Sequence, residues 1–367
     1  MKKLIILIIS FLLCGCSHDM NKKEIDEVNL IHVLGIDYFE GEYTLNAIYS
    51  TGGRADQVGK SSPGTEEIAK GMGKTAYEAY EDLKFKNKKS VSIAHTGYML
   101  IGEEAAKQGL DLCLDFLSRD ETVKMEALIY ITKGVKAADF FSQGQDNKQL
   151  IHEDLEAISQ KQQELITRND NTLVNLLNDM RQSYSSVLVP YLLAENKNFV
   201  IEGYAVFDKL KLKDYLDNET SNGVNFVKGI IRRYPIYLKD QVSLLLSYSD
   251  TKLKSKLVNK NIVITIHVDF ETMMKEVTTK EDIFTREELS KLTEEQNQFI
   301  QKTIEKSVNY STSSGLDILQ IARLVENQHV KEWKDLEADW SKSIFKVKYE
   351  YEFNSKIAKS FILGNER

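Results

Sequence analysis

The stretch NIVITIHVDF, residues 261–270, alternates apolar and polar side chains along most of its length. Because successive side chains of a β-strand point to opposite faces, this period of two predicts a strand with one buried and one wet face. The stretch FKVKYEYEF, residues 345–353, repeats the pattern. Its inward-facing side chains are expected to be those of Phe345, Val347, Tyr349, Tyr351 and Phe353. Such alternation is typical of antiparallel strands, so an antiparallel sheet is predicted in the second half of the chain.

A long amphipathic helix is predicted between these two strands. Thr285 and Glu288 have the spacing of a capping box, in which two side chains bond to free backbone N–H groups at the start of a helix. Apolar residues then recur at helical spacing from Leu289 to Val308, and a shorter helix is expected over residues 315–327. The predicted architecture is a sheet whose apolar face is covered by helices.

The first half of the chain mixes short strands with helices. The predicted strands cover residues 28–36, 43–49, 90–102 and 124–132. The predicted helices begin near Thr75 and cover residues 103–119, 152–167 and 172–182. Strands and helices therefore alternate throughout, and the fold class is predicted to be α+β with more than one domain.

The length of 367 residues suggests two or three domains. Residues 16–198 are assigned to an N-terminal α/β region. The segment 51–65 is rich in Gly, Ser and other polar residues, and it could divide this region into two subdomains. Residues 199–367 are assigned to a C-terminal domain, an antiparallel sheet with helices.

The start of the chain has the features of a bacterial lipoprotein signal peptide, assigned to residues 1–15. Two lysines precede the uncharged apolar run 4–13, which is too short to span a bilayer core, since that takes ~20 residues. The motif LCGC, residues 13–16, then resembles a lipobox. Cys14 would leave with the signal peptide, and Cys16 would become the acylated N-terminal residue.

A lipid on Cys16 would hold the chain durably at the outer face of the cytoplasmic membrane. The net charge of −7 becomes −9 once Lys2 and Lys3 leave with the signal peptide. This charge argues against nucleic acid or anionic lipid as the main partner and mainly indicates solubility. The remaining cysteine, Cys113, lies in an apolar run, which favours a buried and inert thiol.

No motif in the sequence requires an active site, and the chain is predicted not to be an enzyme. The stretch GMGKT, residues 71–75, resembles the end of a P-loop, but Ile68 stands where that motif needs a glycine, so a turn into a helix is preferred. The six histidines lack the spacing of paired metal ligands. Neither a metal site nor a cofactor is therefore predicted, apart from the lipid on Cys16.

The segment DFLSRDE, residues 115–121, gathers acidic groups and an arginine at the end of a predicted helix. A pair of carboxylates could perform acid–base chemistry there. Ion pairing at a solvated helix end is the preferred interpretation, because it is the more common role of such clusters.

Several segments in succession resemble the Ger(x)C family, the C subunits of bacterial spore germinant receptors. After the lipobox they are KEIDEVNLIHVLGIDYFEGEYTLNAIY (23–49), GKTAYEAYEDL (73–83), AHTGYMLIGEEAAKQGLDLCLDFLSRDE (94–121), IEGYAVFDKLKLKDYLD (201–217) and LDILQIARLVENQHVKEWKDLEADWSKSIFKVKYEYEF (316–353). Each segment alone is weakly specific, whereas their order over nearly the whole chain is specific. The chain departs from the family pattern at Asp214-Tyr215-Leu216, where Gly-Trp-Leu is common, and at Ser17-His18-Asp19, where Trp-Asp is common.

The resemblance implies a mixed α/β body of three domains and a non-enzymatic role. Such a subunit would work with a polytopic A subunit and a transporter-like B subunit in the spore inner membrane, where nutrients trigger ion and dipicolinate release. Among the matched positions, Cys16 is expected to carry the lipid. Candidates for an interaction surface are His95, Arg119, Glu121, Trp333 and Trp340. The competing interpretations are burial of both tryptophans in the core and hydrogen bonding of His95 inside its strand.

Two other classes of protein stay open at this stage. A solute-binding lipoprotein would usually have two α/β lobes with parallel sheets, and the alternating strands near residues 262 and 345 argue against it. An envelope hydrolase would be supported by a clustered acid pair in a deep cleft. A flat surface around Asp115 and Glu121 would weaken that interpretation.

Overall fold

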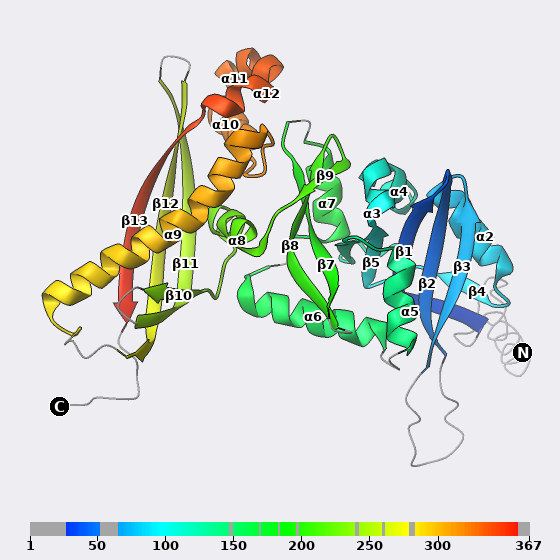
Figure 1. Ribbon diagram of the computed structural model, residues 1–367. Helices are drawn as coiled ribbons and strands as arrows, with labels where there is room; N and C mark the ends of the chain where they lie inside the picture. The colour runs from blue at the N-terminus through cyan, green and yellow to red at the C-terminus, as the bar shows by residue number, and fades with distance from the viewer. Residues whose placement is uncertain are drawn as a thin grey trace, which may run out of the picture.

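The computed structural model of the chain describes residues 27–51, 65–146, 150–168, 170–182, 184–195, 198–238, 242–258, 261–278 and 283–358. The predicted signal peptide (1–15), Cys16 and most of segment 51–65 lie outside the described residues. The described strands form a nine-stranded and a four-stranded sheet. Figure 1 shows the two sheets side by side, with helix α8 (Asn218–Val227) between them.

The nine-stranded sheet has the order β3-β2-β1-β5-β6-β7-β8-β9, with β4 paired to β1. Its strands are β1 (Val28–Phe39), β2 (Glu42–Thr51), β3 (Thr65–Gly73), β4 (Ser90–Ser92), β5 (Tyr98–Gly102), β6 (Leu128–Thr132), β7 (Val187–Glu195), β8 (Asn198–Asp208) and β9 (Lys211–Tyr215). The central strands β1, β5, β6 and β7 run parallel, and the outer pairs are antiparallel. All five residues of β6 are buried, as expected for a parallel strand covered on both faces.

Helices cover both faces of this sheet. One face packs against the helices α2 (Ala76–Lys86), α3 (Glu103–Gln108), α4 (Leu110–Ser118) and α7 (Leu173–Met180). The other face packs against the helices α5 (Ala137–Asp146) and α6 (Ile151–Leu165). The α+β fold class predicted from the sequence is confirmed.

Two predicted elements of the first half are interrupted. The strand expected over residues 90–102 is divided into β4 and β5 by a turn. The helix expected over residues 103–119 is divided into α3 and α4 at Gly109, whose φ of +149° is rarely adopted by residues that carry a side chain. Both predictions missed a change of direction because the apolar pattern continues across it.

The sheet is continuous across both predicted domain boundaries in this half. β2 and β3 pair with each other from Tyr43↔Gly73 to Thr51↔Thr65, so the segment 51–65 does not separate two sheets. The strands β8 and β9 follow the boundary expected at residues 198–199, yet they belong to the nine-stranded sheet. This sheet therefore ends at Tyr215.

The four-stranded sheet has the order β10-β11-β12-β13, formed by β10 (Pro235–Leu238), β11 (Val242–Val258), β12 (Asn261–Val277) and β13 (Lys348–Ala358). The pairs β10–β11 and β11–β12 are antiparallel, but β12 and β13 are parallel. The sheet predicted to be antiparallel is therefore mixed, since its last strand runs parallel to its neighbour. The long helical connection between them returns the chain to the end of the sheet at which β12 begins, so β13 runs in the same direction as β12.

That connection consists of α9 (Arg286–Ser314), α10 (Ile321–Gln328), α11 (Val330–Leu336), α12 (Trp340–Ser343) and two short 3-10 segments, η2 (Glu337–Asp339) and η3 (Ile344–Lys346). Thr285 caps α9, since its hydroxyl accepts a hydrogen bond from Glu288 N at 3.2 Å, as the capping-box spacing predicted. Figure 1 shows α9 lying across the sheet. Its buried side chains include those of Leu292, Ile300 and Val308.

Phe345 is an exception to the predicted inward face of the last strand. It lies in η3 and its side chain is 55% exposed, whereas Val347 is buried and Tyr349, Tyr351 and Phe353 pack at the edge of the core. The Phe345 ring lies so close to Gly315 that a Cβ there would be 2.5 Å from it. Phe345 therefore packs over the end of α9 and does not continue the inward-facing side of β13.

Candidate functional site

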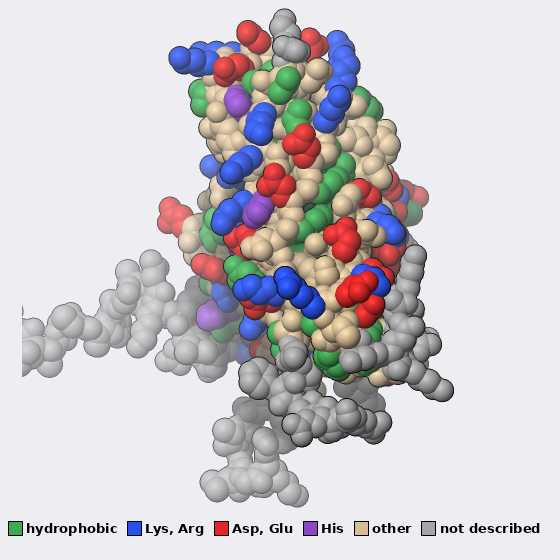
Figure 2. All heavy atoms as spheres, turned by 90° about the vertical axis from the view of Figure 1, so that its left-hand side faces the viewer, with side chains coloured by type: hydrophobic (Ala, Val, Ile, Leu, Met, Phe, Trp, Pro, Cys, Tyr) green, Lys and Arg blue, Asp and Glu red, His purple; other side chains and the backbone are tan. Residues whose placement is uncertain are grey.

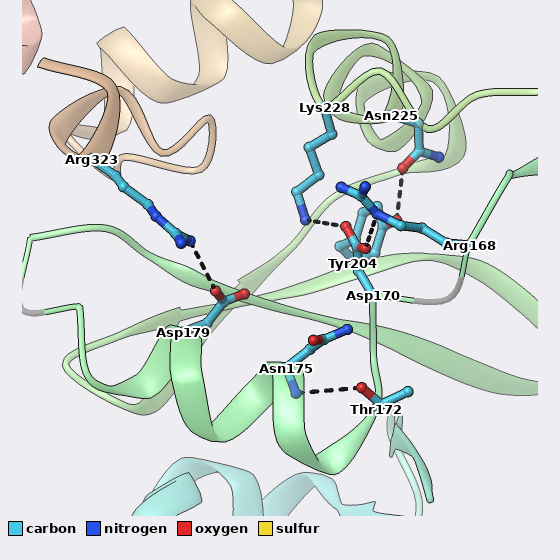
Figure 3. Close-up of polar contacts among 9 residues, drawn as sticks. All are labelled: Arg168, Asp170, Thr172, Asn175, Asp179, Tyr204, Asn225, Lys228 and Arg323. Atoms are coloured by element: carbon cyan, nitrogen blue, oxygen red, sulfur yellow. Dashed lines mark hydrogen bonds and ion pairs between the residues drawn. The ribbon is translucent and has the colours of Figure 1, made fainter. Parts of the chain in front are cut away.

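The two halves of the chain meet around a polar cavity of about 640 Å³. The first half contributes the segment that follows α6 and the helix α7, and the second half contributes the end of α8, strand β11 and helix α10. Figure 3 shows that charged side chains from both halves point toward one another here. We call this region the junction.

Asp170 lies between two cations in the junction. Its carboxylate is 2.9 Å from Arg168 Nε and 3.4 Å from Lys228 Nζ (Figure 3). Lys228 is the C-cap of α8, and its side chain is only 14% exposed, with the ammonium 5.8 Å from the ring of Tyr204. Because Lys228 and Asp170 come from different halves, their ion pair links the halves directly.

A second, looser pair joins Asp179, at the end of α7, to Arg323 on α10, with 3.9 Å between Oδ1 and Nη1. Burial raises the pKa of Asp179, and the nearby Lys228 and Arg323 oppose that rise. The carboxylate is therefore partly desolvated without a close hydrogen-bonded cation, whereas half of the Arg323 side chain stays exposed.

The residue before α10, Gln320, lines the junction and has an unusual backbone conformation. Gln320 has a φ of +56°, in the left-handed region, which costs a residue with a side chain roughly 1 kcal/mol. Asp317 supports the start of this helix, because its buried carboxylate accepts hydrogen bonds from Ile321 N and Ala322 N at 2.8 and 2.7 Å. It also accepts one from the Ser185 hydroxyl, which belongs to the first half.

A smaller apolar crevice of about 200 Å³ lies between α6, β8 and α8. Phe199, Ile201 and Leu165 line it, together with Tyr204, whose hydroxyl donates a 2.7 Å hydrogen bond to Asn225 Oδ1. Tyr204 therefore contacts both this crevice and, through its ring, Lys228 in the junction.

The chemistry of the junction suits binding or mechanical coupling. It combines three cations with two carboxylates and several amides, and no Cys, Ser or His among its lining residues offers a nucleophile with a base beside it. Within the described residues, no group of three or more His, Cys, Asp or Glu side chains is arranged to hold a metal ion. None of the helices in that part of the chain is both long and apolar enough to cross a membrane.

Three of the residues proposed from the sequence lie on the first half, away from the junction. His95 lies in the exposed turn between β4 and β5, and not inside a strand as the competing interpretation had it. Arg119 caps the end of α4 and makes two hydrogen bonds to Asp115, at 2.8 and 2.9 Å. Glu121 is exposed in the following turn. The side chains of Asp115 and Arg119 are 60% and 75% exposed, so this acid cluster is a solvated helix end.

The two tryptophans are core residues. Trp333 and Trp340 are 4% and 3% exposed, and their rings lie 5.3 Å apart. Tyr184 from the first half packs edge-on against Trp333, also at 5.3 Å. Neither tryptophan can serve as an exposed interaction surface, and the competing interpretation, that they anchor the core, describes their environment.

The solvent-exposed face of the four-stranded sheet carries charges of both signs (Figure 2). His267 lies 3.3 Å from Glu352 and 3.2 Å from Asp269, while Lys356 is 3.4 Å from Glu271. Because positively and negatively charged side chains are intermixed among those shown in colour, this face does not present a surface of a single sign.

Sequence reasoning missed a partly buried cluster on the other face of the first half. Glu66 accepts hydrogen bonds from Ile151 N and His152 N at the start of α6, and it lies 2.5 Å from His152 Nδ1. His32 stacks on His152 at 5.3 Å, and burial, followed by the charges of His152 and His95, lowers the pKa of His32. No spacing in the sequence links these residues, because they come from β1, β3 and α6.

Two family models match the chain in succession. The one described as "Spore germination protein N-terminal domain" matches residues 21–194, and the one described as "Spore germination B3/ GerAC like, C-terminal" matches residues 202–360. Together they cover most of the chain in the expected order. The chain belongs to the Ger(x)C family of spore germination proteins.

Individual proteins with a similar sequence or fold agree with this assignment. Spore germination protein KC of Bacillus subtilis (strain 168) is 22% identical over 373 residues, which is 92% of this chain and 90% of the relative. A crystal structure of the GerBC protein has the same fold, with a TM-score of 0.58 and 17% identity over 88% of this chain and 96% of that chain.

One departure from the Ger(x)C pattern has a structural account. Tyr215 stands where Trp is common in the family, and its ring packs edge-on against Tyr191 at 4.9 Å. Its hydroxyl donates a 3.0 Å hydrogen bond to Glu103, and Lys133 lies 4.6 Å from the ring centre. An aromatic residue at this position therefore still connects β9, the last strand of the large sheet, to α3.

Proposed function

We propose that this chain is the lipid-anchored C subunit of a spore germinant receptor, acting without catalysis beside A and B membrane subunits. The observation that carries the proposal is the succession of both Ger(x)C family models over residues 21–194 and 202–360. The junction supports a binding or coupling role, because its charges link two halves and its described lining holds no Cys, Ser or His that could act as a nucleophile or its base.

The membrane anchor is part of the same proposal. It rests on the lipobox at residues 13–16, where Cys16 would be acylated and Cys14 would be lost with the signal peptide. Cys16→Ala should abolish labelling by a palmitate analogue and release the chain from membranes. Cys14→Ala is the matched control and should leave both unchanged. Labelling of the Cys16→Ala chain would show that the anchor is assigned to the wrong residue.

The receptor role is tested by deleting the gene and measuring germination in defined nutrients. The readouts are the loss of optical density and the release of dipicolinate. Loss of at least one nutrient response, restored by the wild-type gene but not by Cys16→Ala, is expected. Normal germination in every nutrient, in a strain that also lacks its paralogues, would contradict the receptor role.

A second candidate function is capture of a small solute by the chain itself. It is favoured by the size of the junction cavity, about 640 Å³, and by the presence of both cations and carboxylates in it. Titration calorimetry of the purified chain with amino acids, sugars and nucleosides would test this role. Heat of binding that disappears in Arg323→Ala would support it. An envelope hydrolase is disfavoured, because Asp115 and Glu121 are exposed and Asp115 is bonded to Arg119.

A further inference from the structure

An exposed phenylalanine lies among lysines at one end of the first half. The segment LysPheLysAsnLysLys, residues 84–89, begins in the last turn of α2 and leads into β4. The side chain of Phe85 is 88% exposed, more than any other large apolar side chain described. A single exposed apolar side chain is common on protein surfaces, but an exposed aromatic ring among lysines is a combination typical of segments that lie in a membrane interface.

The lysines around Phe85 differ in how far they are neutralised. Lys84 and Lys86 each contact a carboxylate of α2 at 2.5 Å, namely Glu81 and Asp82. Lys88 and Lys89 are exposed, and neither is paired with a carboxylate in the described part of the chain. The segment therefore ends in two free ammonium groups beside an unburied ring.

This segment lies next to the start of the described chain. β4 pairs in parallel with the first residues of β1, with Ser90 opposite Val28. Figure 1 shows the end of α2, β4 and the start of β1 together at the same end of the molecule. Cys16 precedes Val28 by 12 residues, which span at most about 40 Å even when fully extended. A lipid on Cys16 would hold this end of the protein close to the bilayer.

We propose that residues 84–89 form a membrane-contacting tip, in which Phe85 enters the headgroup region and Lys86, Lys88 and Lys89 contact anionic lipids. The location of the tip rests on the proposed lipid anchor, whereas its chemistry does not. Each lysine near an anionic bilayer raises partitioning about five-fold at moderate salt. The net charge of −9 expected without the signal peptide does not cancel this attraction, because charges more than about 10 Å from the surface are largely screened.

Composition favours a bilayer over an acidic protein as the occupant. Lysine is depleted in protein–protein interfaces, and hot spots there are enriched in Trp, Tyr and Arg. Lysines flanking an exposed aromatic ring are instead typical of segments that lie in the membrane interface, where the lysine stems follow the apolar layer and the ammonium groups stay in water.

The test uses the full acylated chain carrying Phe85→Trp, bound to vesicles. Both natural tryptophans are buried, so fluorescence quenching by brominated lipids reports mainly on the introduced indole. We expect strong quenching when anionic phosphatidylglycerol makes up about one third of the lipid. Weaker quenching is expected in pure phosphatidylcholine. Adding Lys86→Gln, Lys88→Gln and Lys89→Gln should reduce the quenching at least several-fold.

The matched control changes three exposed lysines of β11, Lys252, Lys254 and Lys256, to Gln in the same background. It removes the same charge far from the tip and should leave the quenching unchanged. Recovery of the chain with floated vesicles reports separately on the anchor. A chain that floats without quenching would overturn the tip and leave a protein partner as its occupant. Quenching that persists in Cys16→Ala would show that the tip contacts lipid without the anchor, and palmitate labelling tests the anchor separately.

Discussion

At the scale of single residues, carboxylates accept hydrogen bonds from the first N–H groups of several helices. Asp37 on β1 accepts hydrogen bonds from Ala137 N and Ala138 N of α5, at 2.7 and 3.0 Å. Glu66 does the same for α6, and Asp317 does so for α10. Free N–H groups and the positive end of the helix dipole make these positions favourable for an anion. Asp37 and Glu66 thereby tie helices to the sheet from far away in the sequence.

Asp317 gives a pH dependence with a defined sign. Burial raises its pKa from 3.8 to about 6, so the folded chain keeps a proton that the unfolded chain has already lost between these values. The free energy of unfolding should therefore fall as pH rises from about 4 to 6, by at most about 3 kcal/mol from this group. In Asp317→Asn that fall should be smaller. Denaturant unfolding at a series of pH values measures it.

Asp335→Asn is the control for this experiment, because Asp335 is exposed on the neighbouring helix α11. Its profile should follow that of the wild type. The Asn variant at position 317 should also lose about 1–3 kcal/mol at every pH, since an amide oxygen cannot accept from both backbone N–H groups as well as a carboxylate does. An unchanged slope between pH 4 and 6 in Asp317→Asn would refute the assignment.

At the scale of elements, helix α8 joins the junction to the second core. Its C-cap, Lys228, reaches Asp170, and its Gly223 lies against α9. A Cβ at Gly223 would be 2.4 Å from the backbone oxygen of Thr303, closer than such atoms can approach. The close approach of α8 and α9 therefore depends on this glycine. A substitution of Gly223 should also displace the end of α8 at the junction.

Gly223→Ala should destabilise the fold by roughly 2–3 kcal/mol, because one of two packed helices must move away from the other. Gly97→Ala is the matched control, since the nearest atom to a Cβ there would be 4.0 Å away. Chemical denaturation of both variants measures the difference. Equal stability of the two would show that α8 and α9 separate at little cost.

Lys228→Met tests the electrostatics of the junction while keeping most of the apolar stem. Lys228 is the largest influence opposing the effect of burial on Asp179, so its loss should raise the pKa of Asp179 further. Carboxyl chemical shifts in an NMR titration would report this directly. Lys211→Met, an exposed change on β9, should leave the titration of Asp179 in place. A lower pKa in Lys228→Met would contradict the geometry described.

At the scale of the whole molecule, one strand serves two cores. In β8, Ala205 and Phe207 belong to the core of the first half, whereas Tyr204 and Val206 belong to the core of the second half. Trp333 is similarly covered by Tyr184 from the other half. The boundary between the two family domains, near residue 198, therefore does not separate two independent folding units.

The chain should accordingly unfold in a single cooperative transition. Because neither core is complete without β8, loss of one half exposes apolar surface of the other. Calorimetry is expected to show one peak whose van't Hoff and calorimetric enthalpies agree. Two resolved transitions, or a stable fragment beginning at residue 216, would show that the halves fold separately.

The sequence determined which faces are buried and where several elements begin. The alternation in residues 261–270 predicted one buried face, and the structure buries Ile262, Ile266 and Phe270 on it. The spacing of Thr285 and Glu288 located the start of α9, and the apolar run around Cys113 predicted its full burial. The order of short segments pointed to the Ger(x)C family. Such features are local, so they can be read from a few neighbouring residues.

Only the tertiary structure decided how those elements meet. A period of two shows that one face of a strand is buried, but it is the same for a parallel or an antiparallel neighbour, so the direction of β13 was mispredicted. The junction joins Asp170 to Lys228 and Asp179 to Arg323, pairs far apart in sequence. Burial of Trp333 and Trp340 likewise depends on the packing of α11 against α12 and on Tyr184 from the other half. Long-range contacts of this kind follow from the complete packing of the chain, which no local pattern contains.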